Sequence, residues 1–222
     1  MMLPLTKNSE VEIPIGKLSL KGKFSMPEKA YGIVLFSHGS GSSRNSPRNN
    51  FVAKVLQQQG LGTLLFDLLT EEEDRVYENR FNIGLLTRRL ISATEWVMVY
   101  THGRKFPIGY FGASTGAASA LRAAAHFKDK IRAVVSRGGR PDLAMQDLPG
   151  VTVPTLLLVG GLDLTVIDMN QEALEKMQAH SKLQIIPGAS HLFGEPGKLQ
   201  IVAELSAQWF IHHFQKEKAH VS

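Results

Sequence analysis

The 222-residue chain contains no cysteine. This absence excludes disulfide bonds, thiolate metal ligands and cysteine nucleophiles, so covalent catalysis would have to use serine, threonine, lysine or a carboxylate. The chain also lacks any apolar run that approaches the roughly 20 residues of a membrane-spanning helix, and its first ten residues lack the apolar core of a secretory signal. We therefore expect a cytoplasmic protein without a membrane partner.

Positive charge is not concentrated anywhere in the sequence. The 25 basic and 20 acidic residues give a formal charge of +5, and the basic residues are scattered from Lys7 to Lys218. Nucleic-acid binding needs a clustered basic stripe or a recognisable module, so no nucleic-acid partner is predicted. The length and the 43% hydrophobic content suit one domain with an extended core, which we predict to span residues 1–222.

Short apolar segments alternate with longer amphipathic ones along most of the chain. The order is typical of a mostly parallel sheet with helices on both faces. Residues 10–25 instead alternate in polarity around Gly16 and Lys17, which predicts an antiparallel hairpin at the sheet edge. The predicted strands span residues 32–37, 62–67, 107–111, 131–136, 155–159 and 182–186. The predicted helices span residues 47–59, 81–101, 114–127, 166–179 and 197–215. The fold class is therefore α/β, with a sheet of about eight strands and no large cap.

The segment Gly112-Ala113-Ser114-Thr115-Gly116 lies between a predicted strand and an alanine-rich predicted helix. This is the G-x-S-x-G pattern in the context that a nucleophile elbow requires, because the serine occupies a tight, strained turn and small residues must flank it. An ordinary glycine-rich turn with Ser114 as a helix cap is the alternative. Ser114 is thus the candidate nucleophile.

Asp163 and His191 each follow a later predicted strand, in the chain order Ser, Asp, His that this architecture predicts. Carboxyl ends of parallel strands collect functional groups at one edge of the sheet, so His191 could accept the Ser114 proton while Asp163 orients its ring. Asp168 and Asp142 are rival acids that rank lower. Asp168 falls where the next helix should already have begun.

The loop His38-Gly39-Ser40-Gly41 follows the first parallel strand. Its glycines would let the Ser40 N–H face the same oxyanion as the N–H of Thr115. The glycines from Gly39 onward also partly match a dinucleotide-binding pattern, with Asp67 as a ribose-binding acid, but Arg44 replaces the third glycine. That alternative leaves the three candidate catalytic residues unexplained.

Three residues near this edge are candidates for substrate contact. Arg137 and Arg140 follow the strand at 131–136, and either guanidinium could bind a substrate carboxylate; pairing with a neighbouring acid is an equally good interpretation. His38 is the third candidate. The charged segment 68–80 has no regular period and could form a mobile flap over the site, although a plain surface connection is more common.

With these residues in place, the chain resembles α/β-hydrolases over residues 10–215, and its length without an inserted cap is similar to the dienelactone hydrolase-like branch. The motifs that carry the resemblance are H-G-x-G, G-x-S-x-G, Asp163 after a strand and a late G-x-x-H ending at His191. Dienelactone hydrolases proper have a cysteine nucleophile and a glutamate near the loop that Ser37-His38-Gly39 occupies here. The resemblance therefore implies ester-type chemistry with a serine nucleophile.

The predicted activity is hydrolysis of a small carboxylic ester or lactone through an acyl-enzyme on Ser114. The resemblance implies His191 as base and then acid, with Asp163 orienting it. No metal and no cofactor is predicted, and the partner is a small-molecule substrate. The alternatives are a peptidase or thioesterase with the same triad, and a non-catalytic protein that binds a small ligand or dinucleotide.

Overall fold

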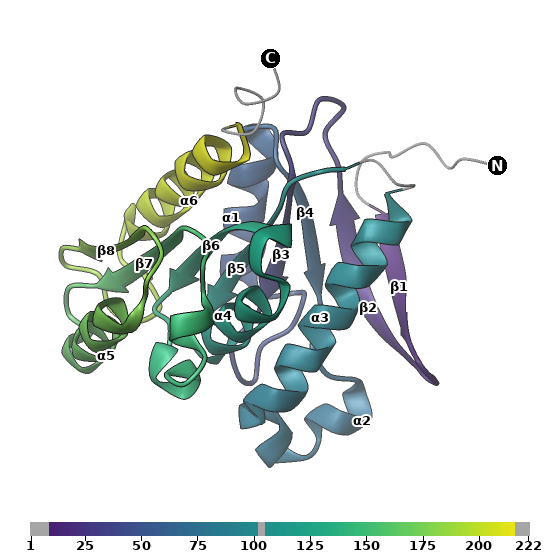
Figure 1. Cartoon of the computed structure of the whole chain (residues 1–222), viewed down its shortest axis with the longest axis horizontal. Helices are drawn as coiled ribbons and strands as arrows, with labels where there is room; N and C mark the ends of the chain where they lie inside the picture. Colours follow the sequence, from purple (N-terminus) through teal and green to yellow (C-terminus); the bar gives the residue numbers. More distant parts are fainter. Residues whose placement is uncertain (1–8, 102–104, 216–222) are drawn as a thin grey trace.

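A computed structural model describes residues 9–101 and 105–215 of the chain (Figure 1). They form an eight-stranded sheet in the order β1-β2-β4-β3-β5-β6-β7-β8. The strands are β1 (Ser9–Ile15), β2 (Leu18–Ser25), β3 (Ile33–Ser37), β4 (Gly62–Phe66), β5 (Ile108–Ala113), β6 (Ile131–Arg137), β7 (Thr155–Gly160) and β8 (Ser181–Ile186). The pairs β1–β2 and β2–β4 are antiparallel and the others parallel, which confirms the predicted α/β class.

Burial on both faces of the sheet explains why the central strands form apolar runs in the sequence. Every residue of β3, β4, β5 and β7 is buried, because parallel strands inside a doubly covered sheet have no solvent face. In the strands at the two edges, β1 and β8, only Ile13 and Ile186 are buried, and the other residues are partly or fully exposed. Gly16 has a φ of 59° and closes the predicted β1–β2 hairpin, since a left-handed turn residue matches the twist of the two strands.

Helices cover both faces of the sheet. Figure 1 shows α3, α4 and α5 in front of it and α1 and α6 behind it. They span α1 (Pro47–Gln58), α3 (Ile83–Tyr100), α4 (Thr115–Phe127), α5 (Leu164–Lys176) and α6 (Lys198–Gln215). One hydrophobic cluster includes Leu90 and Leu121 on the front face, and the other includes Val52 and Phe210 on the back face. Within the described residues, no helix is long and apolar enough to cross a membrane.

The segment 68–80 differs from the predicted irregular flap. It contains a short helix, α2 (Glu71–Asp74), followed by the 3-10 helix η1 (Tyr77–Phe81). Thr70 and Glu73 form a reciprocal capping box at the start of α2, and Glu73 also forms an ion pair with Arg89 of α3. These contacts attach the segment to the body of the molecule, and they were missed because one helical turn has no hydrophobic period.

Candidate active site

Ser114 occupies the turn between β5 and α4 in a strained backbone conformation. Its φ is 52° and its ψ is −123°, a left-handed combination that is costly for a residue with a side chain. A Cβ on Gly116 would lie 2.1 Å from the carbonyl oxygen of Ser37, and one on Gly112 would lie 2.4 Å from the Ala117 Cα. The two glycines of the motif therefore let α4 pack directly against β3 and β5. This is the local geometry that a nucleophile elbow requires.

His191 and Asp163 are hydrogen-bonded across 28 residues of sequence. The His191 Nδ1 lies 2.6 Å from Asp163 Oδ2, and with Nδ1–H as the donor the imidazole Nε2 is left as a proton acceptor. Asp163 is the N-cap residue of α5, yet its side chain makes no capping hydrogen bond. The carboxylate is therefore directed at the histidine instead of the helix.

The two rival acids have other surroundings. Asp142 accepts two hydrogen bonds of 2.8 Å from Arg140, and Asp168 lies exposed within α5. Of the three candidate acids, Asp163 alone is paired with His191 among the contacts of the described residues.

Ser114 and His191 line the same cavity, with a volume of about 220 Å³. The Gly39–Ser40 loop, the N-terminal turn of α1 and Arg137 complete its walls. We call it the Ser114 cavity. Sites for drug-sized ligands usually occupy about 300–1,000 Å³, so this cavity suits a small substrate.

The predicted oxyanion donors lie next to each other, but one of them is engaged. The Ser40 N–H donates to the Thr115 hydroxyl over 2.9 Å. Thr115 is the first residue of α4, so its own N–H has no partner within the helix. The Thr115 N–H is therefore not committed to the helix, whereas a substrate oxygen would have to compete with the Thr115 side chain for the Ser40 N–H.

His38 does not line the Ser114 cavity, and the expectation that it contacts substrate is not supported. Its Nε2 accepts a hydrogen bond of 3.0 Å from the Leu68 N–H, and its Nδ1 lies 3.0 Å from the Gly39 carbonyl oxygen. Burial lowers the pKa of His38, in keeping with a neutral ring that donates once and accepts once. His38 is a positioning residue that ties the Gly39 loop to the end of β4.

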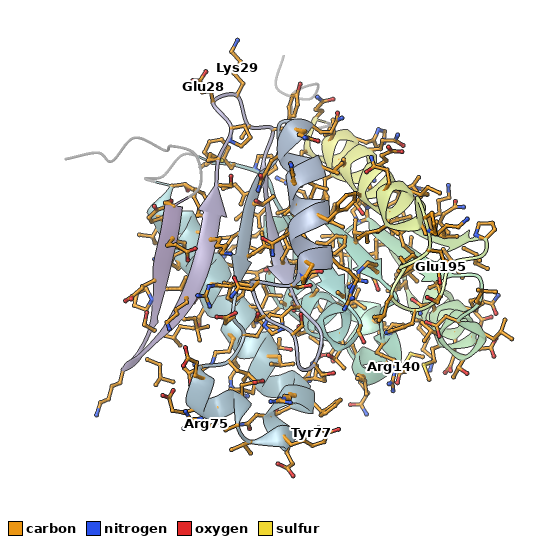
Figure 2. All side chains as sticks on the ribbon, turned by 180° about the vertical axis from the view of Figure 1, so that it is seen from behind. Glu28, Lys29, Arg75, Tyr77, Arg140 and Glu195 are labelled. Atoms are coloured by element: carbon orange, nitrogen blue, oxygen red, sulfur yellow. The ribbon has the colours of Figure 1, made fainter. Side chains whose placement is uncertain are left out.

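Arg137 and Arg140 have different surroundings although three positions separate them. Arg137 is 6% exposed and lines the Ser114 cavity, and its contact with substrate stays a prediction. Arg140 pairs with Asp142 and has a half-exposed side chain, so its predicted substrate contact is not supported. Figure 2 places Arg140 at the same end of the molecule as Arg75, opposite Glu28 and Lys29.

The structure adds three residues that the sequence did not single out. Arg48, in the first turn of α1, lines the Ser114 cavity. Glu195, labelled in Figure 2, accepts a hydrogen bond of 3.1 Å from the Ser190 N–H, and hydrogen bonds with Ser190 lower the pKa of Glu195. Phe193 is buried at a φ of 56°. Glu195 and Phe193 fix the loop that carries His191, and none of the three belongs to a motif with a spacing that could reveal it.

The residues proposed for dinucleotide binding are used otherwise. Asp67 forms an ion pair with the Arg44 side chain and accepts a hydrogen bond of 2.7 Å from the Arg44 N–H. A ribose would have to displace both contacts. Among residues 9–101 and 105–215, no group of three or more histidine, aspartate or glutamate side chains is placed to hold a metal ion.

Fold and site together define an α/β-hydrolase, and solved structures of that fold superpose on the chain. The dienelactone hydrolase of Anabaena variabilis matches with a TM-score of 0.90 and 54% identity, over 94% of this chain and 99% of that one. Est1E from Butyrivibrio proteoclasticus shares the fold, with a TM-score of 0.77 and 16% identity over 92% and 98% of the two chains. The chain belongs to the dienelactone hydrolase family, whose model matches residues 26–216.

Relatives in Mycobacterium tuberculosis have a different name. Two curated proteins, each called "Putative phosphoribosyl transferase", are 51% identical to the chain over 210 residues. The match covers 95% of this chain and 47% of theirs. The chain thus spans about half the length of these relatives.

Proposed function

We propose that the protein hydrolyses a small carboxylic ester or lactone through an acyl-enzyme on Ser114. The observation that carries the proposal is the 2.6 Å hydrogen bond between His191 and Asp163, beside a serine in an elbow conformation on the same cavity. Membership of the dienelactone hydrolase family supports hydrolysis as the reaction class. That the bond cleaved is an ester, and that Ser114, His191 and Asp163 cleave it, is our proposal.

In the proposed mechanism, the Ser114 Oγ attacks the substrate carbonyl carbon while His191 Nε2 accepts the hydroxyl proton. Asp163 holds the imidazole in the required tautomer and stabilises the imidazolium. The oxyanion accepts hydrogen bonds from the Thr115 N–H and, once the Thr115 hydroxyl yields it, from the Ser40 N–H. His191 then protonates the leaving oxygen, and a water activated by the same ring cleaves the acyl-enzyme.

The same triad would serve a thioesterase or a peptidase. A cavity of about 220 Å³ favours a small acyl group over an extended peptide. We do not propose phosphoribosyl transfer for this chain, because it spans only 47% of the M. tuberculosis relatives that have that name. The hydrogen-bonded Asp163 and His191 suit acyl transfer instead. We also propose that the partner is a small-molecule substrate and that no cofactor is needed. The proposed location is the cytoplasm, and cell fractionation would test it.

Covalent labelling of Ser114 tests the proposal directly. The intact mass of the wild type should increase by one adduct after exposure to a fluorophosphonate, whereas that of Ser114→Ala should not change. The acceptor of the label is an activated serine, so a folded wild-type protein that stays unlabelled would sink the serine-hydrolase mechanism. A labelled wild type would then be assayed with matched oxygen ester, lactone and thioester substrates to settle the bond that is cleaved.

A further inference from the structure

Arg137 is a buried cation without a counterion. It is the last residue of β6, is 6% exposed and lines the Ser114 cavity. No residue that the structure describes forms an ion pair or hydrogen bond with its guanidinium, and its Nε is buried without a partner. Its one aromatic contact is with Phe193, whose ring centroid lies 5.9 Å from the guanidinium carbon. Buried charges are normally paired, so the missing partner needs an explanation.

A second guanidinium shares the cavity. Arg48, in the first turn of α1, lines the Ser114 cavity, and its Nε is also buried without a partner. Burial, and then the neighbouring charge of Arg48, lower the pKa of Arg137 to about 10. Arg137 therefore carries its positive charge at neutral pH. None of the residues that line this cavity is acidic.

Other arginines of the described chain show that a partner is the usual arrangement. The paired ones are Arg44 with Asp67, Arg80 with Asp74, Arg89 with Glu73, Arg122 with Asp147 and Arg140 with Asp142. Arg75 and Arg88 have no ion pair among the described residues, but both are exposed to solvent. Arg48 and Arg137, also without an ion pair, instead line the cavity beside Ser114. Two positive charges confined in one small cavity repel each other, and an anion between them would relieve that repulsion.

The remaining wall of the cavity also suits an anion. Ser46 and Asn49 at the N-terminus of α1 also line it. Pro47 has no N–H and the Asn49 N–H is donated to the Ser46 hydroxyl, so this helix start contributes its partial positive charge and not a free row of donors. Asn49 is 3% exposed. Two guanidinium groups and a helix start match a group with two negative charges better than a single carboxylate, because several oxygens can be hydrogen-bonded from different sides.

We propose that Arg48 and Arg137 bind a phosphate group carried by the substrate, next to the carbonyl that Ser114 attacks. The inference rests on the proposed function and narrows its substrate class to small phosphorylated esters or lactones. The small volume of the cavity places the phosphate and the scissile carbonyl close together in the substrate. Arg48 and Arg137 thereby determine specificity, and the triad performs the bond cleavage.

Binding of inorganic phosphate to the wild-type protein tests the site without any ester. Isothermal titration calorimetry at neutral pH should give a dissociation constant of about 1 mM or below. Arg137→Gln and Arg48→Gln should each weaken binding by about tenfold or more, because a charge-assisted contact is lost. Arg122→Gln, which removes an arginine that is ion-paired to Asp147 away from the cavity, should leave binding unchanged. Circular dichroism checks the fold of each variant, and Arg48→Gln still decides the question if Arg137→Gln does not fold.

Three results would overturn the inference: no phosphate binding by the wild type, equal binding by both cavity variants, or equally tight binding of acetate at the same ionic strength. Fluorophosphonate labelling distinguishes failure of the phosphate site from failure of the proposed function. Labelled Ser114 without phosphate binding removes the phosphate site alone. Arginine-dependent phosphate binding without labelling removes the hydrolase mechanism and leaves the anion site standing. Protection of Ser114 from the label by phosphate is expected if both hold.

Discussion

Two cavities that share Ser42 lie at the carboxyl edge of the sheet and differ in how their charges are balanced. The Ser114 cavity contains two arginines without acidic partners. The other, of about 190 Å³ and lined by His38, Arg44 and Asp67, we call the Asp67 cavity. There Arg44 is neutralised by Asp67, and both ring nitrogens of His38 contact backbone atoms.

This difference in charge pairing distinguishes polar groups that stabilise the structure from polar groups that are available to bind a ligand. Both cavities contain arginine and histidine, so residue type alone does not distinguish them. In the Asp67 cavity Arg44 is ion-paired with Asp67, although its Nε, like those of Arg48 and Arg137, has no hydrogen-bond partner, and His38 holds the Gly39 loop in place. In the Ser114 cavity the arginines remain unpaired at a cost in stability. Substitutions in each cavity test this contrast.

Asp163→Asn should lower kcat by about 10³- to 10⁴-fold, because the amide no longer holds His191 in the correct tautomer or stabilises its positive form. Hydrolysis of 4-nitrophenyl acetate measures the effect. Asp168→Asn, on the exposed side of α5, is the matched control and should keep wild-type activity. Equal losses in both variants would remove Asp163 from the catalytic site.

Removing one arginine from each cavity should change stability in opposite directions. Arg44→Met leaves the partly buried Asp67 without its partner and should lower the free energy of unfolding by about 1–2 kcal/mol. Arg137→Met removes an uncompensated buried cation and should raise it by about 1 kcal/mol. For a chain of this size, that is a shift in Tm of about 2–4 °C. Thermal unfolding of both variants in phosphate-free buffer makes the comparison, and destabilisation by Arg137→Met would assign that arginine a structural role.

His38 should make stability depend on pH through the Asp67 cavity. Burial lowers its pKa in the folded protein, so below its ordinary pKa of about 6.5 the unfolded chain binds a proton that the native chain does not. The free energy of unfolding should therefore fall as the pH falls below that value, by up to about 1.4 kcal/mol per pH unit from this group, until the lowered pKa is reached.

Urea unfolding of wild type and His38→Gln, at about pH 7 and about pH 5, isolates this contribution. His38→Gln should be less stable at the higher pH, because its contacts with Leu68 and Gly39 are lost, but should show a smaller change between the two. His212→Gln, exposed on α6, controls for the loss of a histidine. Identical pH dependence in wild type and His38→Gln would contradict a neutral, buried His38.

The sequence predicted most of the fold because the features involved are local or periodic. The fully buried strands appear as apolar runs, and the elbow at Ser114 has its glycines at fixed spacing. Asp163 and His191 could be placed at one edge because parallel strands end there together. Charge pairing could not be predicted in the same way, because it depends on which elements pack side by side. Arg137 and Arg140 look alike in sequence, yet Asp142 is within reach of one of them only.

The same limit applies to Arg48 and to segment 68–80. Arg48 reaches the cavity because α1 packs against the sheet with its N-terminus at the catalytic edge, and no motif records that approach. The helices α2 and η1 are each too short for a hydrophobic period, and a capping box and the Glu73–Arg89 ion pair stabilise the first of them. Tertiary contacts thus decide the details that sequence patterns leave open.

The smallest effect is expected at the boundary between the two cavities, where the Gly39 loop meets Ser114. The Ser40 N–H donates to the Thr115 hydroxyl over 2.9 Å, so a substrate oxygen must compete for that donor. Thr115→Val removes the competing acceptor while keeping the shape of the side chain. Because one hydrogen bond contributes about 0.5–1.5 kcal/mol net, kcat/KM should rise by about two- to tenfold. Thr115→Ser, which keeps the hydroxyl, is the matched control. A lower kcat/KM in Thr115→Val alone would mean that the hydroxyl holds the loop in its active position, and the Ser40 N–H would then act only while Thr115 supports it.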